Sequence, residues 1–249
     1  GGAGFLFEQA SSRGHVQETT TIPITFAFTI RNQFTASLTT IRASLAEKNS
    51  LLQMRKEFYI AAKKQAEAST VKGYQFSDDN DYNRVRAFID LLLLHRIDVF
   101  AMKTPGTYYV PVDQDNYIMV RSIFENQIVF RDSSFYDASS WSLIHAYGLP
   151  FTESKVAVSP GIKITSSLPD INKTPEKSNY AYLAHNTDYN THRFIYELEK
   201  AGVIVQTATR PFTSLIDGNP ETFGYGSIVV SVQQQRLNEE MLYTAVKAA

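Results

Sequence analysis

Hydrophobic and polar residues alternate near the start of the chain in a way that predicts two β-strands. Residues 5–7 form a short apolar run, and residues 22–28 place Ile, Ile, Phe and Phe at every second position. Such alternation directs one face of a strand into a core. The first strand has no earlier strand to pair with, so we expect the chain to be a piece of a larger protein.

Residues 32–69 contain neither Gly nor Pro and predict one long helix. Apolar residues recur along it at spacings of four and three, and the charged residues Lys48 and Arg55 interrupt this register. The interruption favours a helix packed on the edge of a domain over an isolated coiled coil, which requires unbroken heptads.

Two later parts of the chain resemble each other. The sequence "DYN" at residues 81–83 recurs at residues 188–190, and "GTYYVPVDQ" from Gly106 recurs as "GSIVVSVQQ" from Gly226. Two matches in the same order indicate a tandem duplication.

Each copy predicts the order strand, helix, strand, strand, helix. An Asp or Asn of the "DYN" stretch can cap the first helix by accepting from free backbone amides. In the first copy Val85, Phe88, Ile89 and Leu92 form one apolar helix stripe. The later strands are expected at residues 97–100 and 108–112 in the first copy and at 203–206 and 228–232 in the second. Helices alternating with short β-branched strands predict an α/β fold.

The predicted organisation therefore has four parts. Residues 1–70 carry the two N-terminal strands and the long helix. Residues 71–150 hold the first β-α-β-β-α repeat and an aromatic segment that contains Trp141, the only Trp of the chain. Residues 151–178 include a stretch rich in Ser, Pro and Lys and are expected to form an exposed linker. Residues 179–249 form the second repeat.

Composition narrows the possible partners. The chain has 249 residues, of which 43% are hydrophobic, and 24 Lys and Arg balance 25 Asp and Glu. This balance favours neither nucleic acid nor an anionic membrane surface as a partner. No apolar run approaches the roughly 20 residues of a membrane-spanning helix. The absence of cysteine excludes disulfides, thiolate metal ligands and cysteine nucleophiles.

A short motif raises the question of a metal site. His15 and Glu18 have the spacing His-x-x-Glu, which supplies two ligands in some zinc hydrolases. A third ligand would have to come from the other histidines: His95, His145, His185 and His192. Because this spacing is common by chance, a solvated loop is the preferred interpretation of residues 15–18. His95 is expected at the end of a helix. His185 and His192, which flank the second "DYN", are expected in a cap region or an exposed turn.

Glu8 is the candidate general base. It directly follows the first apolar run, and burial at the end of a strand disfavours the charged form of a carboxylate, as general-base catalysis requires. A solvent-exposed glutamate at a strand end is the simpler interpretation from position alone.

Two N-terminal stretches, "FLFEQASSRGH" and "FAFTIRNQFTASLTTI", resemble the end of the catalytic domain in zinc carboxypeptidases of the carboxypeptidase A type, especially large multidomain bacterial members. In that family a strand ending in an aromatic–Glu pair supplies the glutamate that activates the zinc-bound water, and Phe7-Glu8 matches that pair. The later "FYDASSWSLIHAYGLPF" is similar to a segment after the peptidase domain, where an amidotransferase-like α/β region lies. The resemblance implies catalysis by Glu8, zinc in the full-length protein, a peptide or protein substrate, and export to the periplasm, cell envelope or medium.

The chain also departs from the family pattern. The family's zinc ligands precede the strand that carries the glutamate, so we expect no metal ligand here, and His15 and Glu18 lie on the wrong side of Glu8 for that role. No glutaminase activity is implied, because its cysteine nucleophile is absent. We expect a C-terminal fragment of an exported zinc metallocarboxypeptidase, inactive and zinc-free without the upstream peptidase domain. The alternative is a non-catalytic α/β interaction or ligand-binding module.

Overall fold

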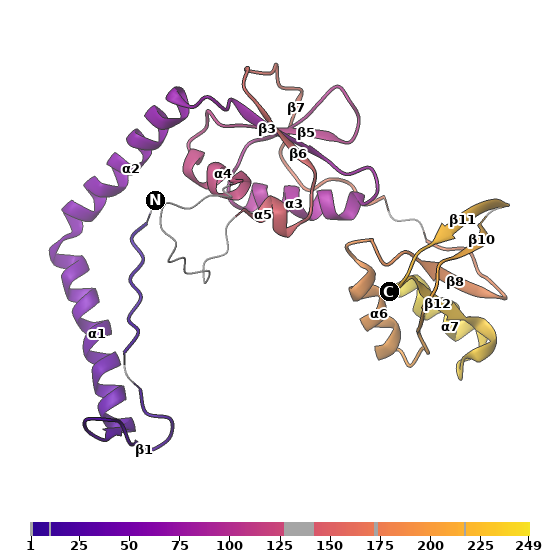
Figure 1. Cartoon of the computed structure of the whole chain (residues 1–249), viewed down its shortest axis with the longest axis horizontal. Helices are drawn as coiled ribbons and strands as arrows, with labels where there is room; N and C mark the ends of the chain where they lie inside the picture. The colour runs from indigo at the N-terminus through magenta and orange to yellow at the C-terminus, as the bar shows by residue number, and fades with distance from the viewer. Residues whose placement is uncertain (1, 10, 127–141, 172–173, 217) are drawn as a thin grey trace. The chain divides into compact units, whose positions relative to one another are not determined.

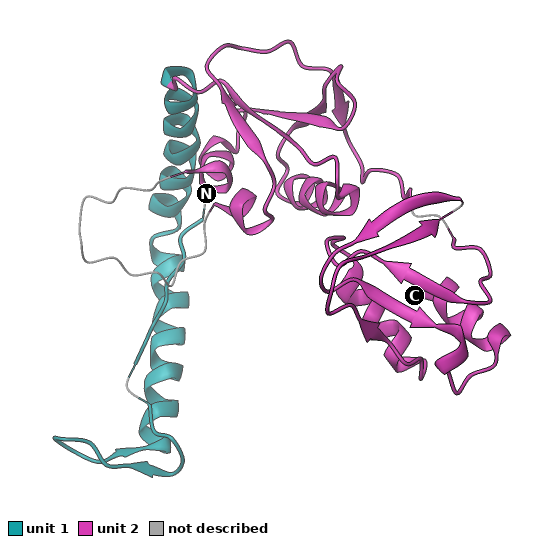
Figure 2. Ribbon diagram, turned by 45° about the vertical axis from the view of Figure 1, so that its right-hand side comes forward, with its two compact units in different colours: residues 1–68 teal, residues 69–249 magenta. Residues whose placement is uncertain are grey.

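The computed structural model is a mixed α/β protein (Figure 1) that divides into two compact units, residues 1–68 and 69–249 (Figure 2). Seven α-helices and several antiparallel sheets form within the part of the chain that it describes. The described residues are 2–9, 11–126, 142–171, 174–216 and 218–249. The aromatic segment around Trp141 was expected to belong to the first repeat, and residues 127–141 lie outside this description.

Two helices make up most of the first unit, α1 (Phe26–Ala46) and α2 (Lys48–Ala68). The strands β1 (Val16–Gln17) and β2 (Ile24–Thr25) pair antiparallel just before α1. The Thr25 side chain accepts a hydrogen bond from the Phe28 amide over 3.2 Å, which caps α1 at its N-terminus.

This arrangement corrects three predictions for the first unit. Residues 5–7 form no strand, and β2 pairs with residues 16–17 instead of with them. Residues 26–28 begin a helix, because the Thr25 cap and the following run without Gly or Pro outweigh their strand-like alternation. The single helix expected over residues 32–69 is interrupted at Glu47, where the backbone leaves the helical conformation at φ −93°, ψ 18°.

The second unit begins with a lobe built on a five-stranded antiparallel sheet, which we call the first lobe. Its strand order is β6-β3-β5-β4-β7, and its three helices lie on one side of the sheet (Figure 1). The strands are β3 (Gly73–Ser77), β4 (Val99–Ala101), β5 (Thr107–Pro111), β6 (Phe151–Ser154) and β7 (Ile162–Ile164). The helices are α3 (Tyr82–Leu94), α4 (Tyr117–Phe124) and α5 (Leu143–Ala146).

Aromatic rings fill the space between this sheet and its helices. Phe76 of β3 meets Phe88 of α3 edge-on, with ring centroids 5.1 Å apart, and Phe88 meets Phe124 of α4 at 5.8 Å. All three side chains are fully buried. Aromatic pairs of this kind add packing energy beyond the area that they bury.

The expected linker, residues 151–178, contributes two strands to the sheet. β6 pairs with β3, and β7 pairs with β4, so both outer strands of the sheet come from this segment. Phe151 explains the position of β6, since its ring packs 6.0 Å from that of Phe124. The residues rich in Ser, Pro and Lys follow these strands along the chain.

The second lobe carries a three-stranded antiparallel sheet in the order β8-β12-β9. These strands are β8 (Ala181–Ala184), β9 (Gln206–Thr207) and β12 (Ile228–Ser231), so the strand expected at residues 203–206 begins later than predicted. The lobe also contains α6 (Thr191–Lys200), a 3-10 turn (Val232–Gln234), α7 (Glu239–Ala248) and a separate hairpin of β10 (Phe212–Ile216) and β11 (Asn219–Phe223).

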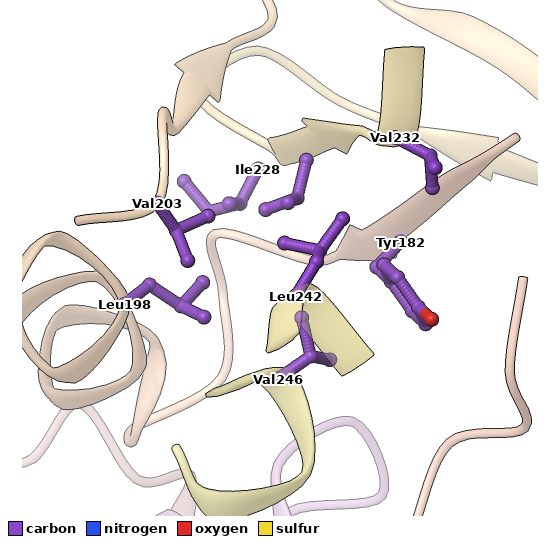
Figure 3. Packing of buried hydrophobic residues seen from close by; sticks show 8 residues of the cluster. Tyr182, Leu198, Val203, Ile228, Val232, Leu242 and Val246 are labelled. Carbon is purple, nitrogen blue, oxygen red and sulfur yellow. The ribbon is translucent and has the colours of Figure 1, made fainter. Parts of the chain in front are cut away.

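The second lobe has a hydrophobic core of its own (Figure 3). Leu198 of α6 and Leu242 of α7 point toward Ile228 and its neighbours on β12. Their burial is almost complete, so both helices are held on the sheet by apolar contacts.

Candidate functional site

Glu8, the candidate general base, lies in an irregular stretch of the first unit, and its side chain is exposed. Phe5, Leu6 and Phe7 before it are exposed as well. The burial that would favour a general base is therefore not formed here, and the exposure of Glu8 agrees with the simpler interpretation from its position, although no strand precedes it. The catalytic role of Glu8 stays a prediction.

The residues on either side of Glu8 line a groove of about 730 Å³. Phe7 and Gln9 form part of one wall, and small residues of α1, among them Ala36 and Ala43, form the other. The N-terminal segment thus runs beside the face of α1 that carries small side chains but does not bury it, since Ala43 stays exposed.

The His-x-x-Glu motif does not gather further ligands. His15 and Glu18 are both exposed, and the His15 carbonyl accepts a hydrogen bond from the Phe26 amide over 2.9 Å. Across the described ranges, no three His, Asp or Glu side chains lie close enough together to hold a metal ion. Within the described residues, His15 and Glu18 therefore have no third ligand beside them.

Three of the other histidines have separate surroundings. His95 is the C-cap of α3, as predicted, and its amide donates to the carbonyls of Leu91 and Leu93. The ring of His145 meets that of Phe151 edge-on at 5.3 Å. His192 is exposed in the first turn of α6.

His185 has a carboxylate partner that the sequence analysis did not identify. Its Nε2 lies 2.6 Å from Oε1 of Glu221 on β11, and its ring stacks on Phe223 at 4.5 Å, which in turn stacks on Phe212 at 5.2 Å. Because the carboxylate and the ring stack fix the imidazole together, the pair fastens the β10–β11 hairpin to the turn after β8. The 36 residues that separate the partners left no local signal in the sequence.

A second polar cluster forms at the start of α3, where the first "DYN" stretch lies. Asp81 is the N-cap, and its Oδ1 accepts from the Arg84 amide over 2.9 Å. The Arg84 guanidinium lies 3.3 Å from Oδ2 of Asp81 and 3.4 Å from Oδ2 of Asp78. Asp81 itself is only 2% exposed.

The second "DYN" stretch meets the first at this cluster. Asn83 donates from Nδ2 to Oδ2 of Asp188 over 2.9 Å. Burial raises the pKa of Asp81 above its ordinary value, and the charge of Asp188 raises it further, while the Arg84 amide, the Arg84 guanidinium and the Tyr189 amide oppose the shift. Position in the sequence predicted the cap but not the meeting of the two stretches.

No protein-family model, curated protein or solved structure matches this chain. None of the helices in the described parts is long and apolar enough to cross a membrane.

Proposed function

We propose that the chain is the C-terminal part of an exported zinc metallocarboxypeptidase of the carboxypeptidase A type. Residues 1–68 would complete its peptidase domain, and residues 69–249 would form the accessory, amidotransferase-like α/β region. The support is the resemblance of "FLFEQASSRGH" and "FAFTIRNQFTASLTTI" to that domain, together with one structural observation on α1.

That observation is an uncovered apolar stripe. Phe34, Ile41 and Leu45 are exposed to 66%, 60% and 72%. Their spacings of seven and four place them on one face of α1, because the helix turns about 100° per residue. Ala36 and Ala43, which line the groove, fall on the opposite face. The N-terminal segment therefore lies along the small-residue face, and the apolar face is open to a further protein surface.

Glu8 has a limited role in this proposal. It accepts a proton from the attacking water, and residues outside this chain hold the zinc. General-base catalysis contributes about 10²–10⁴-fold to a rate, whereas enzymatic accelerations begin near 10⁶-fold. The isolated chain is therefore inactive on peptides.

We also propose that the second unit arose by tandem duplication. The strand orders β3-β5-β4 and β8-β12-β9 support this. In each set of three strands, the strand that comes last in the sequence lies between the other two in the sheet. Within each copy the first helix follows the first strand, α3 after β3 and α6 after β8.

The test compares this chain with the full-length protein encoded by its gene. Zinc content by mass spectrometry and release of C-terminal residues from peptides are measured for both. We expect both in the full-length protein and neither in the chain alone. Glu8→Gln in the full-length protein should abolish peptide hydrolysis and keep the zinc, and Glu18→Gln is the matched control that should remain active.

The second candidate is a non-catalytic α/β interaction module, favoured by the exposure of Glu8 in an irregular stretch. A fully active Glu8→Gln protein would support it. An upstream sequence without a His-x-x-Glu motif and a distant third histidine would do the same.

A further inference from the structure

The two lobes of the second unit meet through polar turns. Each of their sheets is built from strands of one lobe alone, and the second lobe has a separate core. The hydrogen bonds between them converge on the first turn of α3 in the first lobe and on the turn before α6 in the second.

Arg84 is the hub of this contact. Its Nη2 donates to the Thr187 carbonyl over 3.0 Å, and the same guanidinium pairs with Asp78 and Asp81 of its own lobe. A planar guanidinium can serve several acceptors at once in fixed directions, which the point charge of a lysine does not.

Two further contacts accompany Arg84. Asn83 reaches Asp188 over 2.9 Å, and the ring of Tyr147, next to α5, stacks on that of Tyr189 with centroids 6.1 Å apart and planes 9° apart. Tyr189 is nevertheless half exposed. An interface of this polar, partly exposed kind resembles contacts between domains that move.

The contact between the lobes depends on the positive charge of Arg84. Two carboxylates, Asp78 and Asp81, pair with the one guanidinium of Arg84, and a third, Asp188, accepts from the Asn83 side chain in the same cluster. Without that guanidinium, like charges would face each other across the contact where Asp81 is buried.

We infer that this cluster is a latch that holds the two lobes of the second unit closed, with Arg84 as the residue that sets the closed state. When the Arg84 contact is lost, repulsion between the carboxylates of Asp81 and Asp188 separates the lobes. α3 also binds the segment between them, through Tyr82 to the Pro169 carbonyl and through Arg86 to Asp170, so the lobes stay tethered. This inference does not rest on the catalytic role proposed for Glu8.

The test measures the distance between the lobes. The chain has no cysteine, so Lys103→Cys and Lys247→Cys, one exposed site in each lobe, can carry a pair of spin labels for pulsed electron paramagnetic resonance. We expect one narrow distance peak in the otherwise unaltered protein. Arg84→Ala should replace it by a broad distribution shifted to longer distances, and Arg84→Lys should do so partially.

Two more variants make the result decisive. Circular dichroism shows whether Arg84→Ala folds. If it does not fold, Tyr189→Ala is the replacement test, since it removes only a half-exposed ring and should also broaden the distance distribution. Arg193→Ala removes an exposed arginine of α6 and should leave the peak unchanged. A narrow peak that survives in folded Arg84→Ala, a broad distribution in the starting protein, or equal broadening by Arg193→Ala would each overturn the inference.

Discussion

The ring of Tyr74 lies parallel to the ring of Phe124, with centroids 4.5 Å apart and planes 7° apart. The pair joins β3 of the five-stranded sheet to α4. Tyr74 is 5% exposed, and burial, reinforced by the Glu153 carboxylate, raises the pKa of its hydroxyl to about 12. The phenol is therefore held in the neutral form by the surroundings that stabilise the stack.

Tyr74→Phe should reduce the loss of stability in alkaline solution. The folded-state pKa lies above the ordinary value of 10.0, so the contribution of neutral Tyr74 is complete below pH 10 and is lost as pH rises through about 12. A shift of this size corresponds to roughly 2–3 kcal/mol. The free energy of unfolding should thus fall less steeply across this range in Tyr74→Phe, and the exposed Tyr225→Phe is the control. Parallel curves for all three proteins would contradict the prediction.

Asp188→Asn should lower the pKa of Asp81, because the charge of Asp188 is one cause of its elevation. Since the folded-state pKa of Asp81 is above 3.8, its ionised form opposes folding at neutral pH, and this penalty disappears as pH falls through the folded-state pKa. Asp188→Asn should move that change to lower pH. A carboxyl-carbon NMR titration of Asp81 measures the shift, and Asp170→Asn should leave it in place. An Asp81 titration that is identical with and without Asp188 would contradict the assignment.

Local patterns predicted the elements that bury their own apolar stripe. Val85, Phe88, Ile89 and Leu92 are all buried on α3, as their spacing indicated. The strands predicted at residues 108–112 and 228–232 also form, as β5 and β12, at nearly the predicted positions. These elements carry both their hydrophobic periodicity and their boundaries within a few neighbouring residues, so sequence alone was sufficient.

Elements that depend on distant partners were not predictable in this way. β6 and β7 are strands because β3 and β4 offer them free edges, and the stretch rich in Ser, Pro and Lys that follows them led to the prediction of a linker. Residues 26–28 alternate like a strand, but a helix begins there, capped by the hydrogen bond that the Thr25 hydroxyl accepts from the Phe28 amide. The same limit applies to the sites, since neither the bond between His185 and Glu221 nor that between Asn83 and Asp188 has a local signature.

Gly161→Ala should detach β7 from the sheet. A Cβ at this position would collide with the Ala101 carbonyl oxygen, a backbone atom that cannot move without disturbing β4. We expect a loss of roughly 1–3 kcal/mol of stability, as for other overpacked sites, and faster hydrogen exchange in Ile162–Ile164. Gly224→Ala is the matched control, because a Cβ there meets no atom within 4 Å. Equal stability of the two variants would contradict this prediction, because it would show that β7 can shift to accommodate the added Cβ without loss of stability.

Leu242→Ala should destabilise the second lobe. Leu242 is 1% exposed on α7 and packs with Leu198 and Ile228 between helix and sheet (Figure 3). Replacing its isobutyl side chain by a methyl group leaves a cavity that the surrounding sheet and helices fill only in part, at a cost of about 2–5 kcal/mol. Met241→Ala on the same helix is the control, since Met241 is 55% exposed and its loss leaves no cavity. Chemical denaturation followed by amide signals from both lobes separates a local from a global effect. If Leu242→Ala lowered the stability of β3 and α3 as much as that of β8 and β12, the two lobes would unfold as one cooperative unit. If it lowered neither, α7 would contribute no packing energy to this core.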